Sequence, residues 1–214
     1  MDYHVKRIKS EDEIMLCEQF QVEHFQWVDG PKPEVSGYMG YIKGKGLYVE
    51  MTCREKEPKR DCKDPEGRFA SVPGSRVCDD SAMEIFIGFP DKDGAMTADS
   101  LYLNFEINGN GVMYGKYGHG RKNRSFLPPD IYEKAAPGAV VEEHFWKVHV
   151  LFPEDFLKEI SGVALDDPET ALYCNFYKIS ETPEIEHYAS FSEVGSSTPN
   201  FHMPQYFARA VIVD

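Results

Sequence analysis

The sequence carries many short runs of β-forming residues and little helical periodicity. Six runs rich in Val, Ile, Tyr and Phe are predicted as strands, at residues 46–54, 83–89, 101–108, 145–152, 172–179 and 207–213. A further strand is expected at Tyr3–Ile8, and Asn108–Gly111 predicts a hairpin turn onto Val112–Tyr114. Helical patterns are confined to Ser10–Cys17 and Pro153–Ile160. Strands without alternating helices favour an antiparallel sandwich over a parallel α/β sheet.

Length and composition favour one structural domain. The chain has 214 residues, of which 42% are apolar and 13% aromatic, enough to bury one sizeable core. No composition break, repeat or low-complexity segment marks a second unit. We therefore expect an all-β fold, a single antiparallel β-sandwich with long loops and minor short helices.

Two long connections separate the expected strands, at Glu55–Asp79 and Lys116–Glu143. Loops of this length in a compact domain are usually functional. We expect them to form the rim of a ligand site.

The charge balance excludes some partners. The chain has 23 Lys and Arg against 36 Asp and Glu, a net charge of −13, so it repels a nucleic-acid backbone. No apolar window is long enough for a membrane span, and the first residues do not resemble a signal peptide. As written, the chain is expected to be soluble and cytoplasmic, or secreted or periplasmic if an export signal has been removed.

The cysteines and histidines do not match a metal-site template. The cysteines are odd in number and irregular in spacing, which predicts reduced thiols, and they are Cys17, Cys53, Cys62, Cys78 and Cys174. His119, His187 and His202 form a metal site only if the fold brings them together. Asp91–Gly94 opens like a calcium loop but lacks the later ligands, so a turn is expected there.

Strand alternation predicts one polar face. In the run 101–108, Tyr102, Asn104, Glu106 and Asn108 share one face, opposite apolar side chains. In the run 172–179, Asn175 and Tyr177 alternate with Cys174 and Phe176 in the same way. Amides, carboxylates and phenols suit the hydroxyl groups of a sugar, whose C–H face stacks on an aromatic ring. The alternative is an ordinary solvated face of an antiparallel sheet.

Glu84 is a candidate for a buried carboxylate. It shares a strand face with Ala82 and Phe86, which are not typical of a surface. A buried carboxylate needs a partner, and we expect Arg121, or else Arg124, to provide it. A structural ion pair without any ligand fits the same pattern.

The order of motifs along the chain resembles the family 9 carbohydrate-binding modules, particularly their stand-alone members. The motifs are Asp80–Ile87, Leu103–Asn108, Gly118–Arg121, Trp146–Val148, Cys174–Ile179, His187–Phe191 and Pro199–Phe207. The resemblance spans roughly residues 25–213. It implies a jelly-roll or DOMON-like sandwich domain at residues 25–214, with residues 1–24 as a strand and short helix packed on it.

The resemblance also implies a sugar cleft under loops, with structural calcium as a family feature. In well-understood members two tryptophans clamp a terminal sugar; this chain has Ser190 and Phe191 where relatives often carry Trp. Its tryptophans are Trp27 and Trp146, and the alternation of Trp146 with Val148 is typical of a core residue. The predicted sugar-binding residues are Glu84, Asn104, Glu106, Asn108, Arg121, Asn175, Tyr177 and Phe191. We expect Phe191, Tyr177 or Trp27 to provide the stacking ring.

The expected function is non-catalytic recognition of a mono- or oligosaccharide, linked to the breakdown of a xylan-like or glucan polysaccharide. One alternative is a glycoside hydrolase that uses Glu84 and Glu106 as its carboxylate pair. Another is a protein-protein interaction module on a degenerate sugar-binding fold. No GxSxG elbow, HExxH helix or P-loop is present, which argues against those enzyme classes.

Overall fold

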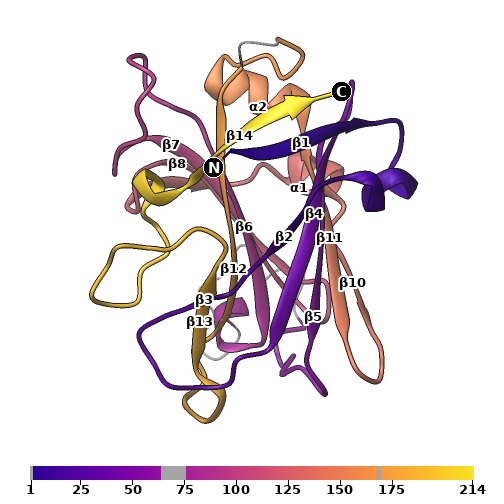
Figure 1. Cartoon of the computed structure of the whole chain (residues 1–214), viewed down its shortest axis with the longest axis vertical. Coiled ribbons are helices and arrows are strands. Elements are labelled where there is room, and N and C mark those ends of the chain that lie inside the picture. Colours follow the sequence, from indigo (N-terminus) through magenta and orange to yellow (C-terminus); the bar gives the residue numbers. More distant parts are fainter. Residues whose placement is uncertain (1, 64–75, 168–169) are drawn as a thin grey trace.

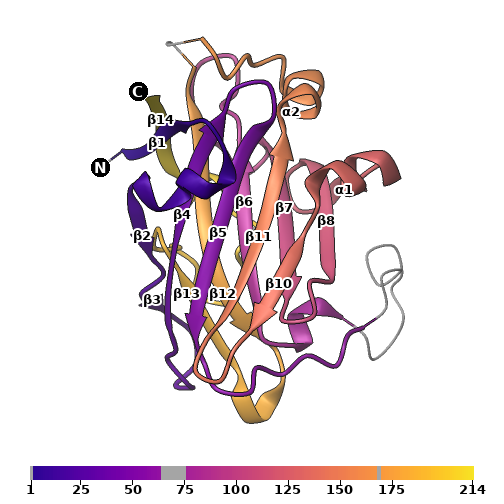
Figure 2. The ribbon, with the colours of Figure 1, turned by 90° about the vertical axis from the view of Figure 1, so that its right-hand side faces the viewer.

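The strands form two facing layers, as the computed structural model shows for residues 2–63, 76–167 and 170–214 (Figures 1 and 2). The described strands are β1 Tyr3–Ile8, β2 Gln19–Gln21, β3 His24–Phe25, β4 Glu34–Ile42, β5 Gly46–Arg54, β6 Ala82–Gly88, β7 Leu101–Asn108, β8 Met113–His119, β9 Asn123–Phe126, β10 Gly138–Val141, β11 Trp146–Pro153, β12 Leu172–Ser180, β13 His187–Ser190 and β14 Ala208–Val213. The order along the sheet is β10-β11-β5-β4-β1-β14-β12-β6-β7-β8-β9, and off this path β2 pairs with β4, β13 with β12, and β3 with β13. The predicted all-β sandwich is confirmed.

The N-terminal strand joins the two layers. β1 pairs in parallel with β14, where Tyr3 is opposite Ala210, and in parallel with β4, where Lys6 is opposite Gly40. The other pairings in the described sheet are antiparallel. β1 lies within residues 1–24. This N-terminal segment therefore contributes an internal strand, between β4 and β14.

Helices are short and lie at the ends and edges of the sandwich (Figure 2). The described helical segments are α1 Pro129–Ala135 and α2 Glu154–Ser161, with short 3-10 turns η1 Glu11–Leu16, η3 Val77–Asp79, η4 Pro183–Ile185 and η5 Pro204–Tyr206. The helix expected at Pro153–Ile160 corresponds to α2. The one expected at Ser10–Cys17 is the 3-10 turn η1, in which Ser10 forms no side-chain cap.

The expectation of a long loop at Lys116–Glu143 is wrong, and strand β4 was not predicted. Lys116–Glu143 is not a long loop: it contains the end of β8, then β9, α1 and β10. These elements are too short to show a periodic pattern, and Pro129 begins α1 because its fixed φ suits a first helical turn. β4 was also missed, because Gly37 and Gly40 interrupt its β-forming residues. The other connection, Glu55–Asp79, lies partly outside the described residues.

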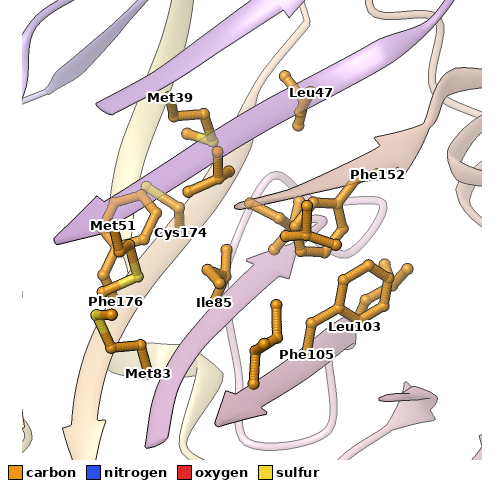
Figure 3. Packing of buried hydrophobic residues seen from close by; sticks show 14 of the residues in the cluster. Met39, Leu47, Met51, Met83, Ile85, Leu103, Phe105, Phe152, Cys174 and Phe176 are labelled. Atoms are coloured by element: carbon orange, nitrogen blue, oxygen red, sulfur yellow. The ribbon is translucent and has the colours of Figure 1, made fainter. Parts of the chain in front are cut away.

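The main core fills the space between the layers. Alternate side chains of β6 and β7, such as Ile85 and Phe105, point into it, as alternation predicts. Phe105 stacks on Phe152 of β11 with ring centroids 4.1 Å apart, which joins the two layers (Figure 3). Trp146 is fully buried in this core, as expected. Within the described residues, no helix has the length and apolar character that a membrane span requires.

A buried polar cluster closes one end of this core. Lys178 of β12 has no exposed side-chain area, and its Nζ lies 3.5 Å from Glu55 Oε2 and 2.8 Å from His187 Nε2. Glu55 also accepts hydrogen bonds from Ser81 Oγ and Trp146 Nε1. Burial alone would raise the pKa of Glu55, but Lys178 and these donors lower it below its ordinary value. Burial and Lys178 lower the pKa of His187 to about 4, so the imidazole is neutral near neutral pH.

Replacing Glu55 by Gln should destabilise the fold strongly, because it leaves the Lys178 ammonium buried without a counter-charge. We expect a loss of about 3 to 5 kcal/mol in the free energy of unfolding, measured by urea denaturation. The double variant Glu55→Gln, Lys178→Met should recover part of it. The control is Lys134→Gln at the exposed pair with Asp155, which should leave the free energy of unfolding nearly unchanged because solvent screens the pair. Equal losses at the two pairs would contradict a structural role for the buried cluster.

Candidate functional site

A cleft of about 470 Å³ lies on the outer face of the layer that contains β6 and β7. Its size is within the range of about 300 to 1,000 Å³ that is usual for small-ligand sites. It is lined by Arg76, Val77, Cys78, Glu84, Glu106, Tyr114, Lys116, Arg121, Arg124, Phe126, Ile179, Glu181, Tyr188, Pro199, Asn200, Phe201 and His202.

Strand register builds the floor of the cleft in rows. Across β6, β7 and β8, Glu84 is opposite Glu106, and Glu106 is opposite Tyr114. Two residues along β7, Asn104 is opposite Lys116, which is opposite Phe126 of β9. A row of carboxyl groups therefore lies beside a row that carries an amide and a cation.

The two carboxyl groups of the floor are buried beside each other. Glu84 is 3% exposed and Glu106 is 7% exposed. Burial, and then the neighbouring Glu106, raise the pKa of Glu84 well above its ordinary value. Burial also raises the pKa of Glu106 to about 7, although Arg124 opposes the shift. The pair therefore retains protons near neutral pH, and protonated carboxyl groups can donate hydrogen bonds to a ligand.

Arg124 connects to this pair through an amide. Asn104 Nδ2 donates to Glu106 Oε1 at 2.8 Å, and Asn104 Oδ1 accepts a hydrogen bond from Arg124 Nη1. The guanidinium carbon of Arg124 also lies 5.1 Å from the centre of the Tyr102 ring. Arg124 thus lies over the floor rather than in solvent.

Gly118 is required for this position of Arg124. Gly118 lies between Tyr102 and Arg124 in the sheet and has a φ of +142°. A Cβ at residue 118 would lie 2.2 Å from the carbonyl oxygen of Asn123 and 2.9 Å from Arg124 Cα. Any larger residue would therefore displace β9 and the arginine it carries.

The loop at residues 199–202 forms one wall of the cleft. Asn200 Oδ1 accepts a hydrogen bond of 3.0 Å from Arg121 Nη1. His202 Nδ1 lies 3.1 Å from the hydroxyl oxygen of Tyr102. Phe201 stacks on Tyr177 with ring centroids 4.1 Å apart, which anchors the loop to the layer beneath.

The structure brings only part of the predicted site together. Glu84, Glu106 and Arg121 line the cleft, and Asn104 lies directly beneath it through its bonds to Glu106 and Arg124. Asn108 does not line it: its amide donates to Cys62 O and Asp80 Oδ2, which fixes a connection. Asn175 is likewise held by the backbone of Ser192.

The predicted stacking rings also lie away from the cleft surface. Tyr177 is fully buried and donates to Phe201 O, so it supports the wall from below. Phe191 packs into the main core against Tyr3, because β12 and the segment after β13 turn its ring inward. Trp27 donates from Nε1 to Ser196 O and packs against Phe201.

The expected ion pair between Glu84 and Arg121 is wrong. Arg121 is exposed and bonds to Asn200, and Glu84 forms no ion pair within the described part of the chain. Arg124 acts on Glu84 only at longer range. The carboxyl group is accommodated by retaining its proton instead of by a paired cation.

Tyr114, Lys116 and Phe126 also line the cleft but were not among the predicted site residues. Tyr114 and Phe126 supply partly exposed rings, in edge contact at 5.5 Å between centroids. Lys116 lies over the Phe126 ring, with Nζ 4.3 Å from its centre. Alternation from Tyr114 to Lys116 was the available signal, but β8 was predicted only as far as Tyr114 and β9 not at all.

The candidate metal site of three histidines is not formed within the described part of the chain. His119, His187 and His202 have separate partners: Asp99 O, Lys178 and Tyr102 respectively. Among the described residues, ligand atoms of Cys78, Asp79 and Glu181 come within 4.8 Å of one another. This group does not suit calcium, which prefers oxygen ligands, because it includes a thiol and Arg76 binds both Cys78 and Glu181.

Comparison with known proteins identifies the family. The model of carbohydrate-binding family 9 matches residues 68–212. The chain belongs to carbohydrate-binding family 9. No curated protein sequence matches it.

Solved structures share the fold of this family 9 chain. A candidate carbohydrate-binding protein from Bacteroides uniformis is 21% identical, with 99% of each chain covered and a TM-score of 0.75. A family 9 module from Caldicellulosiruptor kristjanssonii in complex with cellotriose is 12% identical, covering 99% of this chain and 93% of that one, with a TM-score of 0.62. The same organism's module in complex with glucose is also 12% identical, covering 100% and 96%, with a TM-score of 0.62.

Replacing Glu106 by Gln should change how stability depends on pH. The pKa of Glu106 is raised from 4.5 to about 7, so between these values the folded chain holds a proton that the unfolded chain has lost. Through this group, the free energy of unfolding falls as pH rises across that window. We therefore expect Glu106→Gln to gain stability relative to the wild type from about pH 5 to about pH 8.

Urea denaturation across this pH range measures the effect, with Glu133→Gln at an exposed carboxylate of α1 as the control. The difference between wild type and control should be constant with pH. A constant difference for Glu106→Gln as well would show that Glu106 is ionised throughout.

Proposed function

We propose that the cleft binds a mono- or oligosaccharide without cleaving it, in the breakdown of a xylan-like or glucan polysaccharide. The observation that carries the proposal is the floor of the cleft, where the Glu84, Glu106 and Asn104 groups lie beside the rings of Tyr114 and Phe126. Sugar hydroxyls pair with amides and carboxyl groups, and the apolar face of a sugar ring packs on an aromatic ring. Membership of carbohydrate-binding family 9 and the fold neighbours with bound cellotriose and glucose support the same ligand class.

Membership of a family of carbohydrate-binding modules favours binding over hydrolysis. A glycosidase needs one carboxyl group protonated and the other ionised, with environments that separate their pKa values. Here burial raises the pKa of both Glu84 and Glu106. The raised pKa of both groups suits them to donate and accept hydrogen bonds with a bound ligand.

Calorimetric titration with gluco-, xylo- and galacto-configured sugars and their oligomers tests the proposal. We expect measurable binding that Phe126→Ala weakens by about threefold to tenfold, because it removes a stacking surface. The matched control is Tyr38→Ala, which removes a partly buried ring that packs near Ile8, outside the cleft.

If the folded protein bound none of the sugars in the panel, the result would contradict the proposal and favour the protein-protein interaction module. Equal effects of the two substitutions would place the sugar elsewhere. Hydrolysis of an aryl glycoside by the wild type, lost in Glu84→Gln, would show that the site is catalytic.

A further inference from the structure

Three cations of the cleft have no carboxylate partner among the described residues. Lys116 Nζ lies over the rings of Phe126 and Tyr114, at 4.3 and 5.6 Å from their centres. Arg121 donates to the Asn200 amide, and Arg124 donates to the Asn104 amide and to a backbone carbonyl. All of these contacts are to neutral groups, so none of the three cations forms an ion pair within the described part of the chain.

The acidic residues of the cleft offset these cations only in part, through longer-range attraction. Glu181 already forms an ion pair with Arg76 on the opposite side. Glu84 and Glu106 are buried against each other in the floor, and the amide of Asn104 lies between Glu106 and Arg124. The carboxyl pair is also protonated to a large extent near neutral pH.

The three positive charges act on the same point of the cleft. Burial first, and then Arg124, Arg121 and Lys116 together, lower the pKa of His202 well below its ordinary value. His202 lines the cleft and contacts Tyr102, so the electrostatic potentials of the three cations combine at this point of the cleft. The chain as a whole carries a net charge of −13, so this group of three cations is a local exception in an acidic protein.

We propose that the cleft selects an acidic saccharide, a sugar whose anionic substituent lies against Lys116, Arg121 and Arg124. The inference rests on the proposed function, since it names the class of sugar bound at the same site. The planar forks of Arg121 and Arg124 match a carboxylate, and Lys116 adds a point charge. A uronate carboxylate and a sulfate ester offer the same chemistry to these groups.

The test is calorimetric titration of the full chain with matched monosaccharides. Methyl β-glucuronoside should bind about tenfold or more tightly than methyl β-glucoside, because charge-assisted hydrogen bonds are stronger than neutral ones. The methyl ester of the glucuronoside keeps the shape without the charge and should bind like the glucoside. Glucose 6-sulfate is the arm that separates a sulfate from a carboxylate. Tighter binding of either charged sugar than of the neutral sugars supports the proposal and identifies the substituent.

Arg121→Gln provides the site-specific test. Arg121 is exposed and bonds to one amide in the 199–202 loop, so this variant should fold normally and bind the charged sugar about tenfold more weakly. Binding of methyl β-glucoside should change much less. The control is Lys122→Gln, an exposed cation of the same turn that does not line the cleft, which should leave both affinities unchanged.

The outcomes separate this inference from the proposed function. Equal affinities for the glucoside and the charged sugars would overturn the acidic-sugar inference and leave saccharide binding intact. If Arg121→Gln and Lys122→Gln weakened binding of the charged sugar equally, the preference would come from the overall charge of this turn. That result would overturn the proposed site. Binding of acetate or inorganic sulfate as tight as that of the charged sugars would show an anion site without sugar recognition. Failure of every sugar, neutral or charged, would overturn the proposed function itself.

Discussion

The central strands β6 and β7 are buried on both faces, and the cleft depends on this constraint. Each residue of β6 is buried, and alternate side chains pack into the main core and into a second apolar cluster around Phe86, Tyr102 and Phe201. A strand with two buried faces normally carries apolar residues throughout. Glu84 and Glu106 break that pattern in the middle of the layer. Removed from water, they are more stable protonated than ionised, and they enter the cleft floor as hydrogen-bonding groups with reduced charge.

The sign of the potential in the cleft follows from that burial. If Glu84 and Glu106 were fully ionised, they would offset most of the charge of Lys116, Arg121 and Arg124. Because burial retains protons on the pair, these three cations are balanced only in part. Asn104 reinforces the separation, since its amide satisfies Glu106 with one end and Arg124 with the other. The same desolvation therefore sets both the hydrogen-bonding character of the floor and the positive charge of the wall.

Alternation along single strands could be predicted from the sequence, whereas contacts made by loops and distant segments could not. The split of β7 into an apolar face and a polar face containing Asn104 and Glu106 was confirmed, because it needs only the two-residue period of a strand. The expected pairing of Glu84 with Arg121 failed because Arg124, and not Arg121, lies over the floor, and this placement depends on β9, a strand of four residues with no pattern of its own. Asn108 was placed on the correct face, but the carboxylate that binds it, Asp80, lies 28 residues away.

The positions of the two tryptophans determine what kind of recognition the cleft can provide. Trp146 is buried in the main core, with Nε1 bonded to Glu55, and Trp27 bonds to Ser196 behind the wall formed by Phe201. Neither indole is free to clamp a sugar, so stacking falls to the smaller rings of Tyr114 and Phe126. A smaller ring buries less apolar area and contributes less binding energy. Affinity must then come more from directed hydrogen bonds, which are strongest when one partner is charged. The positions of Lys116, Arg121 and Arg124 beside the small rings of Tyr114 and Phe126 are consistent with binding that depends more on charge-assisted hydrogen bonds than on stacking.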